Sequence, residues 1–260
     1  SSSSAASDVY KRQTQECFIH QLKDMKEALP GYDYIGVGRD DGKEKGEHSA
    51  IFYRTDKFDV IEKGDFWLSE TPDMPSKGWD AVLPRICSWG HFKCKDTGFE
   101  FLFFNLHMDH IGKKARVESA FLVQDKMKEL GKGKELPAIL TGDFNVDQTH
   151  QSYDAFASKG VLCDSYEKAG FRYAINGTFN DFDPNSFTES RIDHIFVSPS
   201  FQVKRYGVLT DTYRSIVGKG EKKQANDCPE EIDIKTYQAL TPSDHFPVKV
   251  ELEFDQRQQK

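Results

Sequence analysis

Four stretches of this chain combine an apolar run with acidic, amide or imidazole side chains at its end. Short apolar runs rich in β-branched and aromatic residues are typical of buried strands. The four stretches are Phe101–His107, Ala138–Asn145, Arg191–Val197 and Ser243–Phe254. Polar groups at the ends of four strands are hard to explain as four independent hydrogen-bonded turns. The sequence therefore predicts a sheet-based α/β fold with one polar site along the ends of its strands.

The turn Ser243–Phe246 is the most informative of these features. It leads into Val248–Phe254, whose alternation of apolar and polar residues is typical of a strand. Asp244 and His245 would then lie together at a strand end. There a carboxylate can hold a divalent cation while an imidazole donates a proton to the same bound group. An isolated Asp-His turn, however, is more often a hydrogen-bonded corner.

Asp143 and Asn145 follow the strand predicted at Ala138–Leu140. Asp143 could accept a proton from water, and Asn145 could donate hydrogen bonds to an anionic oxygen without adding charge. The alternative is an Asx-turn, in which both side chains only satisfy the local backbone.

Asn105 and His107 end another predicted strand and share one face of it, because they are two residues apart. Here the alternative is a pair of polar residues that cap the strand.

Asp193 lies in an apolar strand, where an unpaired carboxylate would be costly. A contact with His245 would satisfy both groups and orient the imidazole. His194 points to the opposite face of that strand, which predicts a structural role.

Taken together, these residues resemble the endonuclease/exonuclease/phosphatase superfamily of metal-dependent phosphoesterases. The matching motifs occur in the order typical of the family and span nearly the whole chain. They are Gln15–Glu16, Asn105–His107, Gly142–Asn145, Arg191–His194 and Ser243–His245. The resemblance implies a four-layer α/β sandwich, in which two packed mixed β-sheets are flanked by helices.

The resemblance also implies roles for individual residues. The catalytic group would be His107, Asp143, Asn145, Asp193 and His245. Glu16 and Asp244 would bind the metal, Mg²⁺ or alternatively Mn²⁺. Glu47, Arg85 and Asn105 would support the site, with Glu47 placed like an acid that pairs with His107 and Arg85 like an arginine that reaches the substrate.

The chemistry implied is hydrolysis of a phosphoester by a water molecule that the metal, the Asp and the His groups activate. The substrate would be a small molecule or a single-stranded nucleic acid. A net charge of −7 argues against holding nucleic acid by bulk charge, but a local patch could still do so. The alternative is a catalytically impaired copy of the scaffold that serves as a ligand-binding module.

The beginning of the chain departs from the pattern of the family. Relatives usually start with a strand that ends in an Asn near the metal, whereas this chain starts with a serine run and reaches Glu16 within a few residues. We therefore expect residues 1–12 to be a non-native or disordered lead, and residues 13–260 to form the catalytic domain. Without the native N-terminus, export cannot be judged from the sequence.

The remaining pattern predicts helices at about 14–29, 113–130 and 153–158, and strands near 32–37, 49–54, 58–66, 85–93, 100–106 and 202–208. No apolar run is long enough for a transmembrane helix. We expect a monomer.

Overall fold

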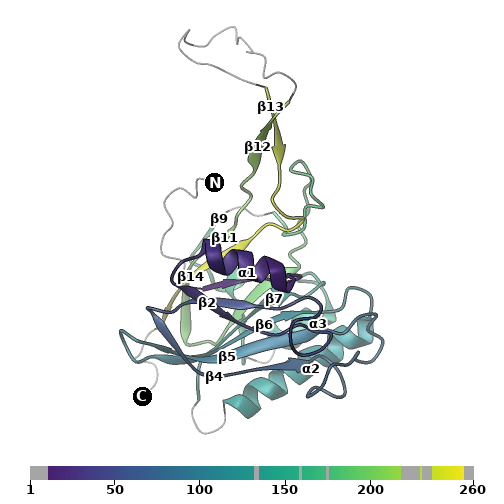
Figure 1. Ribbon diagram of the computed structural model, residues 1–260, viewed down its shortest axis with the longest axis vertical. Helices are drawn as coiled ribbons and strands as arrows, with labels where there is room; N and C mark the ends of the chain where they lie inside the picture. Colours follow the sequence, from purple (N-terminus) through teal and green to yellow (C-terminus); the bar gives the residue numbers. More distant parts are fainter. Residues whose placement is uncertain are drawn as a thin grey trace.

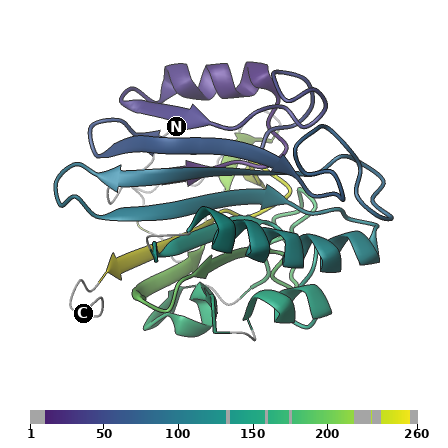
Figure 2. The same ribbon diagram turned by 90° about the horizontal axis from the view of Figure 1, so that it is seen from below.

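The computed structural model describes residues 11–131, 135–157, 160–173, 176–217, 229 and 236–254. Its strands form one six-stranded sheet, two three-stranded sheets and a two-stranded hairpin. The helix α1 lies on one outer side of these strands, and α2 and α3 lie on the opposite side (Figure 1 and Figure 2). The predicted fold class, mixed sheets packed between helices, is confirmed.

The six-stranded sheet carries much of the site. Its order is β4 (Phe58–Trp67), β5 (Ile86–Cys94), β6 (Glu100–His107), β7 (Ala138–Asp143), β10 (Asp193–Val197) and β8 (Cys163–Asp164). In the parallel pair β6–β7, His107 lies opposite Asp143. In the antiparallel pair β7–β10, Asp193 lies opposite Asp143. The register alone therefore brings three predicted catalytic residues to one end of this sheet.

The other strands form two smaller sheets. One has the order β1 (Lys11–Gln13), β3 (Ile51–Arg54), β2 (Tyr32–Ile35), and the other has the order β14 (Val248–Phe254), β11 (Phe201–Val208), β9 (Phe171–Tyr173). We had expected no strand ahead of Glu16, but β1 pairs with β3. Lys11 and Arg12 therefore belong to the folded part, which corrects the boundary of the predicted lead. Residues 1–10 of that lead lie outside the described residues.

The helices are α1 (Ile19–Ala28), α2 (Lys113–Leu130), α3 (Gln151–Ala157) and α4 (Ser165–Lys168). The helix predicted at 14–29 begins only at Ile19, because the residues before it make long-range backbone bonds instead. The amide of Thr14 donates to the carbonyl of Ala50, and the carbonyl of Cys17 accepts from the amide of His48. Periodicity in the sequence does not report such partners.

The apolar strands of the large sheet are buried on both faces. Leu102 and Phe104 point into a core shared with residues of α2 and α3, whereas Phe101 and Phe103 point into a second core shared with residues of β11 and β14. Because both faces are buried, the sequences of these strands are continuous apolar runs rather than alternating apolar and polar residues.

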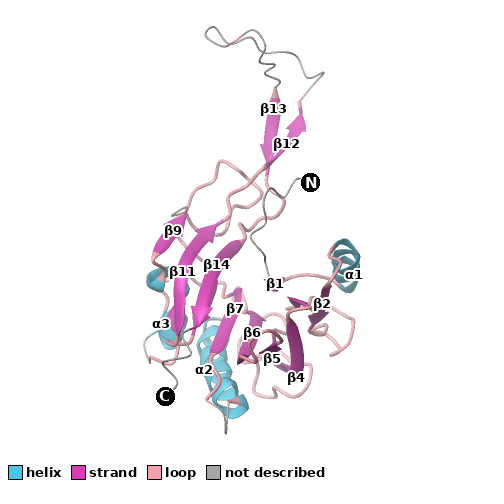
Figure 3. Ribbon diagram, turned by 90° about the vertical axis from the view of Figure 1, so that its left-hand side faces the viewer, coloured by secondary structure: helices cyan, strands magenta, loops and turns pink. Residues whose placement is uncertain are grey.

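The hairpin of β12 (Tyr213–Ile216) and β13 (Tyr237–Leu240) was not predicted from the sequence. It projects away from the body, at the end where β11 finishes and β14 starts (Figure 1 and Figure 3). All four residues of β12 are exposed. Most of the segment that joins the two strands lies outside the described residues.

We predict that Phe196→Ala lowers the free energy of unfolding by about 3–5 kcal/mol, because truncating a buried aromatic ring leaves a cavity. Phe196 is fully buried and its ring contacts those of Phe144, Tyr153 and Phe156. Urea denaturation gives this value. The matched control is Phe171→Ala, on an exposed side chain, for which a loss as large would contradict the assignment of the core.

Candidate active site

The ends of the strands surround a cavity of about 390 Å³. Most of the predicted site residues line it: Glu16, Glu47, Arg85, His107, Asp143, Asn145, Asp244 and His245. Asp193 does not line the cavity but contacts His245, and Asn105 is fully buried outside the lining. Segments that are far apart in the sequence, from Glu16 to His245, thus meet at one place, as expected for a single site.

Asp143 lies at the centre of this cavity. One of its carboxylate oxygens accepts a hydrogen bond of 2.8 Å from the amide of Asn145. The other lies 3.5 Å from Nε2 of His107 and 3.9 Å from Nε2 of His245. Burial, followed by the negative charge of Asp193, raises the pKa of Asp143 to about 7. A carboxyl group with such a pKa can exchange a proton near neutral pH.

His107 is buried and is held as a neutral imidazole. Burial, together with the positive charges of Arg85 and Arg39, lowers its pKa well below the ordinary value of 6.5. Nδ2 of Asn145 lies 3.1 Å from Nε2 of His107 and also donates to the carbonyl of Met108 at 3.0 Å. An amide nitrogen only donates, so Nε2 accepts and the ring proton is on Nδ1. That proton faces Glu47, whose Oε2 is 3.9 Å from Nδ1.

His245 has the opposite electrostatic environment. Its Nδ1 lies 2.7 Å from Oδ2 of Asp193. Burial lowers its pKa, but the hydrogen bond to Asp193 and the negative charges of Asp193 and Asp143 outweigh burial and raise it to about 9. The ring is therefore an imidazolium at neutral pH, with Nε2 available to the cavity. The two histidines of the site consequently differ in charge.

Three acidic side chains face the cavity from separate segments. They are Glu16, which precedes α1, Glu47, which precedes β3, and Asp244, which precedes β14. The pKa of Glu16 is raised by burial and then by the negative charges of Glu47 and Asp244. Ligand atoms of Glu16, His107 and Asp143 lie within 4.8 Å of one another. The two carboxylates of this group are oxygen ligands of the kind that a hard divalent cation prefers.

Two arginines add positive charge to the same cavity. Arg85 donates to Oδ2 of Asp109 at 3.3 Å and lies 2.9 Å from Nδ1 of His110. Arg39 donates to Oε2 of Glu47 at 2.5 Å. Both guanidinium groups are almost fully buried, so they offer fixed donors to an anionic oxygen.

Sequence reasoning missed Arg39. It lies in the Gly-rich loop Gly38–Gly46, whose backbone closes on itself through a bond from the amide of Arg39 to the carbonyl of Glu47. Trp67 fixes the loop from the other side, since its Nε1 donates to the carbonyl of Arg39 at 2.7 Å. In the sequence Arg39 is a single arginine between glycines, a pattern that does not by itself indicate a site residue.

Asn105 does not line the cavity. It is completely buried, and its Nδ2 donates to the carbonyls of Thr14 and Ala50, both at 3.0 Å. Its Oδ1 accepts from Gln15 at 2.6 Å and from Thr141 at 3.0 Å. Asn105 therefore ties the segment that carries Glu16 to the strands that carry His107 and Asp143.

Other observations concern the flanks of the site. His194 is buried on the other side of β10 and bonds to the carbonyl of Val146 at 2.9 Å, as expected for a structural residue. Phe179 lines the cavity, and its ring meets that of His245 edge-on at 5.3 Å. Trp79, which lies in the proline-containing loop before β5, does not line it.

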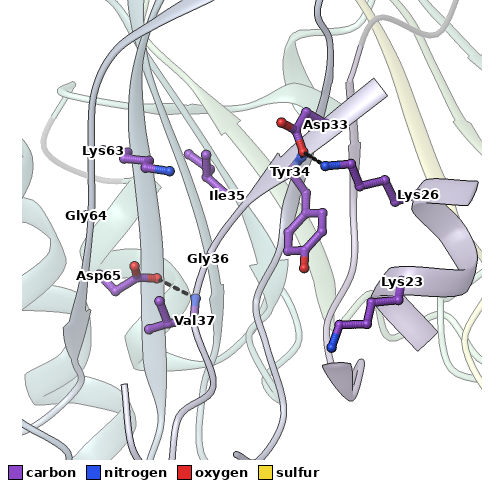
Figure 4. A pocket seen from close by; sticks show the side chains of 10 residues that line it. All are labelled: Lys23, Lys26, Asp33, Tyr34, Ile35, Gly36, Val37, Lys63, Gly64 and Asp65. Carbon is purple, nitrogen blue, oxygen red and sulfur yellow. Dashed lines mark hydrogen bonds and ion pairs between the residues drawn. The ribbon is translucent and has the colours of Figure 1, made fainter. Parts of the chain in front are cut away.

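A larger cavity of about 590 Å³ lies elsewhere, between α1, β2 and β4 (Figure 4). Lys23, Lys26 and Lys63 face it. Lys26 is paired with Asp33 at 2.8 Å, and Lys23 lies 3.6 Å from Glu44. Because acidic partners already engage two of its three lysines, this cavity has little free charge to offer a ligand.

Comparison with known proteins shows the family. The model of the Endonuclease/Exonuclease/phosphatase family matches residues 14–245. The chain belongs to this family. Its members are phosphoester hydrolases that generally use a divalent metal ion, and the chain is accordingly a phosphoester hydrolase.

Three relatives illustrate the range of similarity within the family. The mannosyl-6-phosphatase of Bacteroides thetaiotaomicron is 83% identical with a TM-score of 0.86, over 94% of this chain and 85% of that one. An endonuclease/exonuclease/phosphatase from Bacteroides vulgatus is 36% identical with a TM-score of 0.78, over 95% and 85%. A protein of Acanthamoeba polyphaga mimivirus, described as uncharacterized, is 30% identical over 249 residues, which are 91% of this chain and 83% of that protein.

Among the described residues, no helix is both long and apolar enough to cross a membrane.

We predict that Asn105→Leu lowers the free energy of unfolding by about 3 kcal/mol or more, because it leaves several buried polar groups without partners. Urea denaturation is the measurement. The control is Ser76→Ala, on a half-buried loop residue whose hydroxyl group donates to the carbonyl of Met74. If Asn105→Leu were as stable as the original chain, Asn105 would not hold the two segments together.

Proposed function

We propose that this family member is a divalent-metal-dependent phosphomonoesterase that removes phosphate from the 6-position of mannosyl groups. The main support for this substrate is the similarity to a mannosyl-6-phosphatase, which is 83% identical over 94% of the chain. A cavity of about 390 Å³ is of the size that takes a small ligand. The net charge of −7 disfavours a polyanionic nucleic acid.

Glu16 and Asp244 would hold the cation, with Asp143 near them. Their carboxylate oxygens suit Mg²⁺ or Mn²⁺ better than a softer metal. When bound, the cation would act as a Lewis acid that neutralises charge on the phosphoryl oxygens. The pKa of Glu16 is raised first by burial and then by the negative charges of Glu47 and Asp244, and a bound cation would balance those charges.

The other side chains have separate tasks in this proposal. Asp143, whose pKa is about 7, accepts a proton from the attacking water. Asn145 and His107 position phosphoryl oxygens by hydrogen bonds, and the buried guanidinium groups of Arg39 and Arg85 offset the negative charge of the phosphate. The imidazolium of His245, oriented by Asp193, donates a proton or a hydrogen bond to an oxygen of the phosphoester.

The alternative, a ligand-binding module without activity, has less support. A binding pocket for phosphate needs positive charge and donors, but it does not need a buried carboxyl group with a pKa near neutrality. Asp143 has such a pKa, next to the charged pair of Asp193 and His245. Perturbed groups of this kind are typical of catalytic sites.

Release of phosphate from mannose 6-phosphate, compared with cleavage of single-stranded DNA and RNA at equal phosphoester concentration, tests the proposal. We predict that kcat/KM is at least about a hundredfold higher for the sugar phosphate, since only the small ester can place a terminal phosphate among all the cavity groups. A preference for the nucleic acids would overturn the proposed substrate but leave the hydrolase class intact.

The metal requirement has its own test. We predict that hydrolysis of mannose 6-phosphate stops in excess chelator and returns with Mg²⁺ or Mn²⁺. We also predict that Glu16→Gln raises the concentration of Mg²⁺ needed for half-maximal rate, because it removes a charged ligand. The matched control is Glu44→Gln, on the nearby exposed acidic residue that faces Lys23. Full turnover in chelator would rule out the metal mechanism.

Variants of the catalytic group test the roles assigned above. We predict that Asp143→Asn and His245→Ala each lower kcat by roughly 10²-fold or more, as expected for loss of a proton-transfer group. His194→Ala should mainly reduce thermal stability. An essential His194 with a dispensable His245 would show that the catalytic histidine has been misassigned.

The pH dependence follows from the raised pKa of His245. The imidazolium is the active form, so we predict that kcat/KM is maintained up to about pH 9 and falls as pH rises through that value. Asp193→Asn removes the charge that stabilises the imidazolium, and should move this alkaline limb to lower pH by roughly one unit or more. Initial rates between pH 6 and about 10.5 would show it, and an unmoved limb would contradict the assignment.

A further inference from the structure

Thr178 lies beside the Asp193–His245 pair, in which Asp193 begins β10 and His245 precedes β14. Its side chain is completely buried. Its hydroxyl oxygen accepts two backbone hydrogen bonds, from the amide of Ile192 at 3.0 Å and from the amide of Asp193 at 3.1 Å. One hydroxyl group thus fixes the backbone at the residue that orients His245.

The main chain of the same residue reaches the histidine side of the pair. The carbonyl of Thr178 accepts from the amide of Phe246 at 2.7 Å, directly after His245. The next residue, Phe179, forms a backbone bridge with His245. Thr178 therefore bonds to Asp193 through its side chain and to the neighbour of His245 through its backbone.

No ladder bond of the sheet replaces the hydroxyl group of Thr178. On one side β10 pairs with β7, and on its other side β8 reaches only Phe196 and Val197 among the described residues. In the part of the chain that the structure describes, the first residues of β10 have no partner in β8. There the hydroxyl group of Thr178 accepts the backbone hydrogen bonds that a neighbouring strand would otherwise accept. Without it, the part-buried amides of Ile192 and Asp193 would lose their acceptor, and the backbone would have to move to find another.

We propose that Thr178 is a positioning residue for hydrolysis, which sets the distance between Asp193 and His245 without touching the substrate. The Oδ2–Nδ1 distance of this pair is 2.7 Å. Hydrogen bonds that orient catalytic groups act only within a narrow range of distance and angle. A displacement of the Asp193 backbone would be transmitted directly to the ring of His245. The inference rests on the proposed role of the Asp193–His245 pair.

The test is a double-mutant cycle on release of phosphate from mannose 6-phosphate by the full chain with Mg²⁺. Thr178→Val keeps the shape of the side chain but removes the acceptor. We expect it to lower kcat about tenfold or more, with KM changed less than about twofold. Thr178→Ser, which restores a hydroxyl group at this position, should recover most of the rate. Thr188→Val is the matched control, since the hydroxyl group of Thr188 accepts from the amide of Ser190 in the same loop, whereas the amides of Ile192 and Asp193 donate to Thr178.

The decisive measurement is the same change in the Asp193→Asn background. If Thr178 acts through Asp193, Thr178→Val should there lower kcat less than about twofold, because the two residues act as one unit. An equal loss in both backgrounds would show a general structural role and overturn the inference. An Asp193→Asn variant as fast as the original chain would instead overturn the proposed role of the pair, and with it this inference.

If circular dichroism shows that Thr178→Val does not fold, Thr178→Cys takes its place in the cycle. Thr178→Cys is close in size, and its sulfur is only a weak acceptor. The same dependence on the Asp193→Asn background is expected of it, and an equal loss in both backgrounds would again overturn the inference.

Discussion

The burial of Asp143 at the meeting point of three strands is the constraint on which the site depends. The register of β7 with β6 and with β10 places Asp143 opposite His107 on one side and opposite Asp193 on the other. Two carboxyl groups and an imidazole therefore share a region with little water. Burial disfavours the charged form of each group, which raises the pKa of Asp143 and lowers that of His107. The packing itself therefore produces a proton acceptor and a neutral imidazole.

The other charged side chains of the site lie outside the strands of the large sheet. The imidazolium of His245 and the guanidinium groups of Arg39 and Arg85 bring positive charge, and Glu16, Glu47 and Asp244 bring negative charge. A phosphate group and a divalent cation carry opposite charges, so a cavity lined by both signs can hold the two together. Neither a uniformly basic nor a uniformly acidic cavity of this size would do so.

The sequence was sufficient where local pattern and spacing determine the structure. The apolar runs predicted the central strands, the helix predicted at about 113–130 is α2, and the polar residues that end β6 and β7 indicated where the candidate site lies. The pattern failed where partners distant in the sequence decide. Hydrogen bonds to Ala50 and His48 hold residues 14–17 outside the helix, and Arg39 reaches the cavity only because Trp67 and Glu47 fix its loop. Every residue of β12 is exposed, so a search for buried strands has no pattern to detect there.

The hairpin also differs from the rest of the chain in how it is attached. Within the described residues, β12 and β13 pair only with each other, and they join the body at one end. A segment held in this way can unfold locally without disturbing the cores, as expected of a cooperative unit separate from the body. The boundary between them lies near the buried Thr241, three residues before Asp244. Local unfolding of the hairpin would therefore stop just short of the catalytic residues, which remain with the more stable unit.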